Sequence, residues 1–289
     1  MNGFLLIDKP TGVSSGQCVY FIRSILNQKK IGHCGTLDPL ATGILPLCLG
    51  QATRFSNYVS SQSKTYQVKV FFGLETDTGD ITGKKLCYQE CCIDLIELKE
   101  TLGHMIGEMY QMPPMFSAIK KNGKPLYYWA RKGVYLYREK RKINIESILI
   151  KSFDNKNRAT LEIRCSKGTY IRALVGFIGK QLGTYATIAE LRRVTIGLIK
   201  EEGLVQLKSK DKGYYLRSVI ECDEVLKNLP KINLSKNQLK KIRNGQQVDY
   251  NAVQEIEGIV RLYEEEGPFI GIGKIDSLMK VSPKRLLTK

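Results

Sequence analysis

Apolar and polar residues alternate most regularly in KTYQVKVFFGL, residues 64–74. A period of two places every second side chain on the same face of an extended chain, so this segment is predicted to be a half-buried strand. Further strands are predicted at 4–8, at about 141–152 and at 158–165. The apolar face of the clearest strand comprises Tyr66, Val68, Val70 and Phe72.

Segments with helical spacing lie between these strands. Ser14 or Ser15 can cap a helix that follows it, because a serine hydroxyl accepts hydrogen bonds from the first free N–H groups. Other helices are predicted at about 52–60, 93–107, 126–133 and 170–183, whereas 75–83 is predicted to be a loop and 112–126 an irregular segment with a turn at NGK. Helices set apart from long alternating strands indicate an α+β fold with a partly antiparallel sheet rather than regular βαβ repeats.

The pattern changes after about residue 228. LPKINLSKNQLKKIRNGQQV places a short basic helix before a glycine turn, and the remaining chain from 258 reads as three short strands joined by Gly and Pro turns. About sixty residues of this kind fit a small β-barrel-like domain. The sequence therefore predicts two domains, 1–228 and 229–289.

Composition is that of a globular protein, with 43% hydrophobic residues in a chain of 289. A membrane span needs about 18 consecutive apolar residues, and no such run occurs. The first fifteen residues, MNGFLLIDKPTGVSS, contain a run of only four apolar residues and no basic residue before it, unlike a secretory signal peptide. We therefore expect a cytoplasmic protein without membrane attachment.

Cysteine usage argues against a disulfide scaffold or a zinc site. The chain has eight cysteines but no CxxC pair, and only two histidines, His33 and His104, could complete a ligand set. Cys87, Cys91 and Cys92 cluster without that spacing. We expect reduced, mostly buried thiols and no metal.

Charge gives the strongest indication of a partner. There are 45 Lys and Arg residues against 28 Asp and Glu, a net charge of +17. Such an excess favours binding to a polyanion such as nucleic acid, because neutralising phosphates releases counterions. A general enrichment in lysine is the alternative, but the basic residues also recur in local clusters.

One short stretch, GHCGTLDPLATGILP at 32–46, holds a lone carboxylate, Asp38, among mostly uncharged residues. A structural role is the ordinary interpretation, since Asp before Pro favours a turn and can cap a helix that begins at Pro39. The alternative is that Asp38 carries chemistry, as a base or a nucleophile. The residues alone leave both open.

Further motifs follow in an order that resembles bacterial tRNA pseudouridine-55 synthases, over about residues 3–195. The motifs are LLIDKPTGVSS, GHCGTLDPLATGILP, KTYQVKV, TDTGDITG, PPMFSAIKKNGKPLYYWARKG, and CSKGTYIRAL followed by ELRR. Cys34 stands where this family usually has Thr. The C-terminal sixty residues resemble a small RNA-binding domain of the pseudouridine-synthase and archaeosine-transglycosylase (PUA-like) type.

The resemblance implies a fold and an activity. The fold would have a central mixed, largely antiparallel sheet, flanking helices and a catalytic cleft. The activity would be isomerisation of the T-loop uridine of tRNA to pseudouridine, with a flipped base and no cofactor or metal. The implied partner is the T-arm and T-loop of tRNA, without guide RNA, and the protein is expected to be a monomer.

The resemblance also implies roles for single residues. Asp38 would be the catalytic carboxylate, Arg172 its cationic partner and Tyr66 the ring that stacks on the target uracil. A guanidinium suits a carboxylate because two parallel hydrogen bonds can form. Without the resemblance, Tyr66 would be assigned to the core and Arg172 to the surface.

Substrate contacts are implied for further motif residues. His33 is expected to fill the stack that the flipped base leaves, Leu191 to line the base pocket, and Tyr170 to lie near the base. Arg192 and Arg193 could reach phosphates. Contacts to phosphate are expected from Lys9, Lys64, Lys120, Lys121, Arg131 and Lys167, and in the small domain from Lys236, Lys240, Lys241, Arg243, Lys284 and Arg285.

Three other functions compete with this interpretation. A guide-RNA-dependent relative would share the catalytic motifs, but the stretch around 76–108 and the compact tail favour a stand-alone enzyme. A non-catalytic tRNA-binding or tRNA-folding protein would not need the set of Asp38, Tyr66 and Arg172. A glycosidase would need paired carboxylates, and no second acid accompanies Asp38 in its motif.

Overall fold

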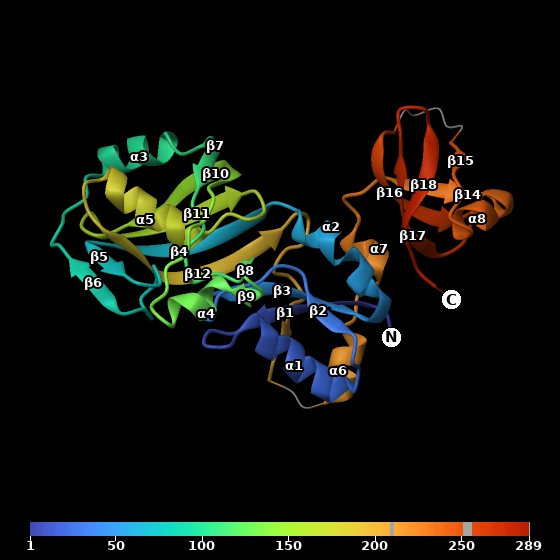
Figure 1. Cartoon of the computed structure of the whole chain (residues 1–289), viewed down its shortest axis with the longest axis horizontal. Helices are drawn as coiled ribbons and strands as arrows, with labels where there is room; N and C mark the ends of the chain where they lie inside the picture. The colour runs from blue at the N-terminus through green and yellow to red at the C-terminus, as the bar shows by residue number, and fades with distance from the viewer. Residues whose placement is uncertain (209–210, 251–255, 289) are drawn as a thin grey trace.

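A nine-stranded mixed sheet forms the centre of the molecule in the computed structural model, which describes residues 1–208, 211–250 and 256–288 (Figure 1). The strands lie in the order β13-β1-β3-β12-β4-β11-β10-β7, with β2 beside β3, and only β1/β13 and β3/β12 are parallel pairs. The predicted mixed, largely antiparallel sheet is confirmed. Its members are β1 (Gly3–Lys9), β2 (Ile31–His33), β3 (Thr42–Leu49), β4 (Lys64–Phe72), β7 (Gly107–Gln111), β10 (Arg141–Phe153), β11 (Arg158–Cys165), β12 (Ala186–Ile196) and β13 (Val205–Gln206).

The alternation in β4 has the predicted effect. Tyr66, Val68, Val70 and Phe72 are buried in one apolar cluster. Helix α5 (Ile171–Gln181) contributes its buried residues to this same cluster, so the helix covers the inward face of the strand. Burial of this face is the main apolar contribution to the stability of the sheet.

Short polar side chains satisfy free N–H groups at the start of some of the helices. Ser14 caps α1 in a capping box with Gln17, as predicted, and Asn27 ends the helix in the left-handed conformation. Asp94 caps α3 through two backbone N–H groups. The elements outside the C-terminal region are α1 (Ser15–Leu26), the 3-10 helix η1 (Gly50–Phe55), α2 (Ser56–Ser60), α3 (Leu95–Gly103), α4 (Leu126–Ala130), α5, α6 (Lys212–Arg217) and α7 (Cys222–Val225).

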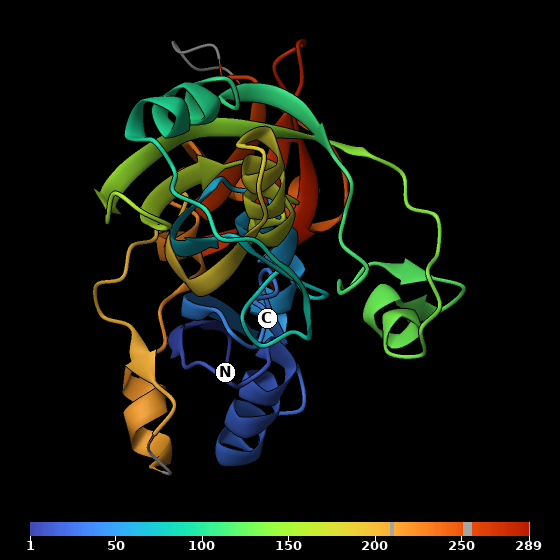
Figure 2. The ribbon, with the colours of Figure 1, turned by 90° about the vertical axis from the view of Figure 1, so that its left-hand side faces the viewer.

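Two excursions leave the central sheet. Strands β5 (Leu74–Thr76) and β6 (Lys85–Tyr88) form a hairpin, so the segment predicted as a loop at 75–83 begins as a strand. Strands β8 (Lys120–Lys121) and β9 (Lys124–Pro125) form a second hairpin, and α4 follows it; Figure 2 shows this green segment projecting from the body of the molecule. Its turn lies at Asn122 and Gly123, both with positive φ, as the NGK signal predicted.

Some boundaries and strands differ from expectation. Helix α4 ends at Ala130, and a turn follows it to Gly133, the predicted stop, where φ is +70°. Strand β3 was not predicted, since nearly all of its residues are buried and no polar alternation marks it. Strand β12 was missed for the opposite reason: Glu190, Arg192 and Arg193 interrupt its apolar pattern.

The C-terminal region folds as a second, five-stranded sheet, which lies at one end of the molecule (Figure 1). The basic helix and the three predicted strands are present, and Ser235 caps the helix. An apolar cluster with Phe55, Cys222 and Ile272 joins this sheet to the rest of the chain. The domain division after residue 228 stays a prediction. The elements are β14 (Lys231–Leu234), α8 (Lys236–Arg243), β15 (Val248–Asp249), β16 (Gly258–Glu264), β17 (Phe269–Ile275) and β18 (Lys280–Leu286).

All eight thiols are free, and five of them are buried, as predicted. Within residues 1–208, 211–250 and 256–288, no helix combines the length and the apolar character that crossing a membrane requires.

A substitution in the buried face of helix α5 should destabilise the fold strongly, because Leu174 is fully buried in the main core. Replacing Leu174 by Ala should lower the free energy of unfolding by about 2–5 kcal/mol in urea titrations, the range for buried leucines. The control is Leu149→Ala on β10, where the side chain is 53% exposed and the change should stay within about 0.5 kcal/mol. Equal losses for both variants would contradict the assignment of the core.

Candidate active site

A cavity of about 360 Å³ is lined by residues of strands β4 and β12 and of the loops beside them. Its walls come from the 35–38 loop, the 117–119 loop, the 168–171 turn and the two strands. The side chains that give it chemical character are Asp38, Lys64, Tyr66, Tyr170, Leu191 and Arg193. Residues that are far apart in sequence therefore converge on one small space.

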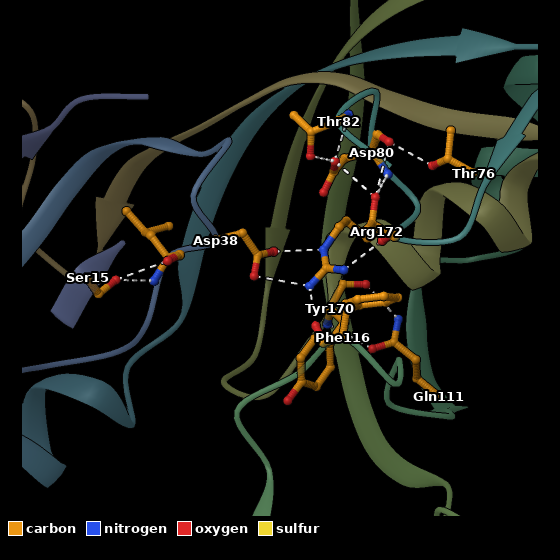
Figure 3. Close-up of polar contacts among 11 residues, drawn as sticks. Ser15, Asp38, Thr76, Asp80, Thr82, Gln111, Phe116, Tyr170 and Arg172 are labelled. Atoms are coloured by element: carbon orange, nitrogen blue, oxygen red, sulfur yellow. Dashed lines mark hydrogen bonds and ion pairs between the residues drawn. The ribbon is translucent and has the colours of Figure 1, made fainter. Parts of the chain in front are cut away.

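A bidentate ion pair lies at the edge of this cavity (Figure 3). The Nε of Arg172 donates to Oδ2 of Asp38 at 2.8 Å, and its Nη2 donates to Oδ1 at 3.0 Å. The Arg172 side chain is only 5% exposed, whereas that of Asp38 is 35% exposed. The pair expected from the sequence therefore forms, with the carboxylate accessible and the guanidinium buried behind it.

Two backbone carbonyls complete the surroundings of the guanidinium. Nη1 of Arg172 donates to the carbonyl of Thr78 at 2.6 Å, and Nη2 donates to that of Phe116 at 2.7 Å. The loop at Thr78 approaches closely at Gly79, where a Cβ atom would lie 3.3 Å from Arg172 Cβ and φ is +77°. A single arginine thus connects the Asp38 loop, the 76–83 loop and the 112–119 segment.

Asp38 is not a helix cap. The chain after Pro39 forms no helix, and the carboxylate is directed to Arg172, so the cap is wrong. The predicted turn is present, because the Ala41 N–H donates to the Asp38 carbonyl at 3.1 Å. The loop is held from behind by Ser15, whose hydroxyl accepts from the Leu37 N–H at 2.8 Å and donates to the Leu37 carbonyl at 3.0 Å. These bonds fix the backbone next to the carboxylate.

Lys9 has a different position from the one expected of a phosphate contact. It is fully buried, and its ammonium donates to the carbonyls of Pro10, Val13 and Pro39 at 2.9, 2.6 and 3.1 Å. An ammonium with all three donors used inside the protein cannot reach a phosphate. The expectation is therefore corrected: Lys9 ties the KPTG turn to the Asp38 loop, and burial lowers its pKa to about 8.

The aromatic and apolar candidates lie as expected at the cavity. Tyr66 is 8% exposed on the inward face of β4, and burial raises the pKa of its hydroxyl. Leu191 on β12 also lines the cavity. Tyr170 precedes α5, and its backbone is fixed by Gln111, whose side chain bonds both its N–H and its carbonyl at 2.8 and 3.1 Å.

The two basic residues of β12 differ in exposure, since Arg193 is buried and the Arg192 side chain is 35% exposed. Arg193 is 1% exposed and donates to the carbonyls of Ile44 and Gly35 at 2.8 and 3.1 Å. Arg192 pairs with Asp8 at 3.0 Å and with Glu201. The suggestion of a phosphate contact is therefore wrong for Arg193, a cavity residue that the sequence did not identify, and stays a prediction for Arg192. The available signal was its place in the ELRR motif, two residues after Leu191.

Not all predicted site residues line the cavity. Lys64 does, with 6% exposure and a hydrogen bond of 2.6 Å to the Ser60 carbonyl. His33 and Lys167 do not. The Nδ1 atom of His33 is buried without a partner among the described residues, and burial lowers the pKa of the ring.

A metal site is not evident in the part of the chain that the structure describes. No group of three or more His, Cys, Asp or Glu side chains is placed to hold an ion there.

Family models match most of the chain. Residues 23–171 match the model described as TruB family pseudouridylate synthase, N-terminal domain, and residues 230–287 match that of pseudouridine synthase II TruB, C-terminal. Asp38 and Tyr66 lie within the first match, and Arg172 lies directly after it.

Curated relatives cover the full length. The chain is 37% identical to tRNA pseudouridine synthase B of Methylobacillus flagellatus, over 99% of this chain and 95% of the relative. It is 36% identical to the protein of the same name from Pasteurella multocida, over 100% and 96%.

Solved structures share the fold at low identity. A protein of an H/ACA RNP bound to a substrate RNA containing 2′-deoxyuridine is 22% identical with a TM-score of 0.76, covering 99% of this chain and 85% of that one. A chain of the archaeal box H/ACA sRNP Nop10-Cbf5 complex is 23% identical with a TM-score of 0.72, covering 98% and 85%. The two family models and the full-length relatives show that the chain belongs to the TruB family of pseudouridylate synthases.

Proposed function

We propose that this pseudouridine synthase isomerises the T-loop uridine at position 55 of tRNA, acting alone and without a cofactor. The observation that carries the proposal is the carboxylate of Asp38, accessible from a base-sized cavity and held from behind by Arg172. The relatives named tRNA pseudouridine synthase B support tRNA as the substrate.

The reaction moves one base on one sugar. The bond from uracil N1 to ribose C1′ breaks, the base turns, and C5 bonds to the same carbon, so no oxidant or reductant is consumed. A positioned carboxylate can serve such a step as a nucleophile or as a base. Asp38 supplies that group, and its bidentate pair with Arg172 fixes the orientation of the carboxylate at the edge of the cavity.

The substrate base has to leave the T-loop to reach Asp38. Flipping a nucleotide costs a few kcal/mol (roughly) for unstacking, which contacts in the pocket must offset. Tyr66 and Leu191 present apolar surface to the flipped uracil, and Tyr170 adds a ring near the base. His33, outside the cavity, is proposed to stack in the gap that the base leaves in the loop.

Basic side chains outside the cavity are proposed to orient the tRNA. Lys167 directly precedes Gly168, which lines the cavity. Three further cations lie in or directly after the projecting segment formed by β8, β9 and α4 (Figure 2). Phosphate contacts fix register and orientation without reading sequence. The cations of the projecting segment are Lys120, Lys121 and Arg131.

The C-terminal sheet is proposed to grip a second part of the tRNA, its acceptor end. Helix α8 places cations on the exposed side of this region, and β18 adds further ones. The protein is proposed to work as a monomer without guide RNA, because its full-length relatives carry the tRNA-modifying name. The proposed contacts are Lys236, Lys240, Lys241, Arg243, Lys284 and Arg285.

Replacing Asp38 by Asn tests the catalytic assignment. The amide keeps the shape of the side chain but is neither a nucleophile nor a base, so pseudouridine formation in an unmodified tRNA transcript should fall at least about 10³-fold. Tritium release from 5-tritiated uridine gives the rate, and filter binding should show tRNA affinity nearly unchanged. Asp154→Asn, in the β10–β11 turn, is the matched control. Unchanged turnover of the Asp38 variant would remove this carboxylate from the mechanism.

Binding of tRNA should weaken steeply as salt rises, because each neutralised phosphate releases counterions. Between 50 and 200 mM salt the affinity should fall at least about tenfold, and Lys120→Gln should reduce the slope of log K against log salt by about one. Lys69→Gln is the control, since Lys69 is exposed but paired with Glu190 at 2.9 Å. A flat salt response would contradict the electrostatic part of the proposal.

A further inference from the structure

Two buried cations border the same cavity on its strand side. Lys64 begins β4, and Arg193 lies in β12 directly opposite Tyr66 in the strand register. They are 6% and 1% exposed, and both line the cavity. Their positive charges are therefore held next to the space that the flipped base would occupy.

Neither charge is neutralised by an acid among the described residues. No ion pair involves Lys64 or Arg193, and the cavity's carboxylate, Asp38, is already engaged in two hydrogen bonds by Arg172. The Lys64 ammonium donates to the carbonyls of Ser60 and Gln62, and the Arg193 guanidinium to those of Ile44 and Gly35. Burying a cation without a counter-ion costs free energy. A ligand that acquires negative charge in the cavity would therefore be stabilised by these two cations.

The two cations face the same stretch of the Asp38 loop. A Cβ atom on Gly35 would lie 3.5 Å from Nη1 of Arg193 and 4.0 Å from Cε of Lys64. Arg193 also acts on the hydroxyl of Tyr66, where its positive charge opposes the rise in pKa that burial causes. Lys64 Nζ has three donors, and the two carbonyls use two of them, which leaves one for a ligand.

The isomerisation creates a negative charge at this place. When the bond between N1 and C1′ breaks, its electron pair stays on the uracil, and the charge spreads over the ring oxygens. The electron pair at C5 then forms the new bond to the electron-poor C1′, which gives a neutral ring with a tetrahedral C5. The C5 proton leaves to a base and N1 takes up a proton, so the product ring is neutral. The detached uracil is therefore an anion between the two bond changes.

We infer that Lys64 and Arg193 form an anion-stabilising wall for the detached uracil, with Lys64 donating directly to a ring oxygen. The inference rests on the proposed function. Preorganised donors aimed at developing charge are among the largest contributions to catalysis in a site that excludes water. Burial at the cavity wall favours the base as the ligand, since a ribose phosphate is hydrated and stays at the mouth of a pocket.

Single-turnover pseudouridine formation by Lys64→Met tests this role. The rate should fall about a hundredfold, as for loss of one oxyanion donor, with the tRNA dissociation constant changed less than about threefold. Lys64→Arg keeps the charge and should retain most of the rate. Lys69→Met, on the outward face of the same strand, is the matched control. Weaker tRNA binding with an unchanged rate would overturn the inference and indicate that Lys64 contacts a phosphate. A variant in which both the rate and the tRNA binding are unchanged would overturn it as well.

The wild-type pH profile tests the same role without a substitution. Burial lowers the pKa of Lys64 to about 8, as do the charges of Arg193 and Lys167, while the thiols of Cys165 and Cys34 act against this shift. The ammonium therefore loses its proton above pH 8, and the rate at subsaturating enzyme should fall between pH 8 and 9.

Lys64→Arg should abolish that fall, because its guanidinium stays protonated over this range. A wild-type rate that stays level from pH 7 to pH 9, or an equal fall in Lys64→Arg, would overturn the inference. A wild-type protein that forms no pseudouridine at any pH would instead contradict the proposed function itself.

Discussion

The bidentate pair between Arg172 and Asp38 is the interaction on which the site depends. Two parallel hydrogen bonds, at 2.8 and 3.0 Å, hold the Asp38 carboxylate in one orientation at the edge of the cavity. The same guanidinium binds the carbonyls of Thr78 and Phe116. Removing Arg172 would therefore free three loops at once as well as the carboxylate.

Buried cations recur as the means by which the irregular segments of the site are held. Loops cannot satisfy their carbonyls by strand or helix bonds, and an unpaired buried carbonyl is costly. Lys9, Lys64 and Arg193 each donate to two or more loop or strand-end carbonyls. Some of the positive charges of the chain are therefore buried, where they fix the loops and place positive charge at the cavity wall. The exposed basic residues are the ones suited to binding RNA.

Local patterns predicted β4, the capped helix α1 and the C-terminal strands, because alternation, caps and turns act within a few residues. They could not predict β3 or the contents of β12, since burial on both faces removes alternation and a buried arginine looks like a surface one. The motif resemblance placed Asp38 and Arg172 together correctly. It misplaced Lys9, which has two local carbonyl partners and a third, that of Pro39, brought from 30 residues away by the tertiary fold.

The most direct test of the site is a crystal structure of the full chain bound to a T-arm RNA. We expect the target uridine outside the loop stack, with its ribose C1′ facing the Asp38 carboxylate, the base between Tyr66 and Leu191, and the Arg172 pair intact. A uridine that stays stacked in the loop, or a C1′ directed away from Asp38, would contradict this assignment of the active site.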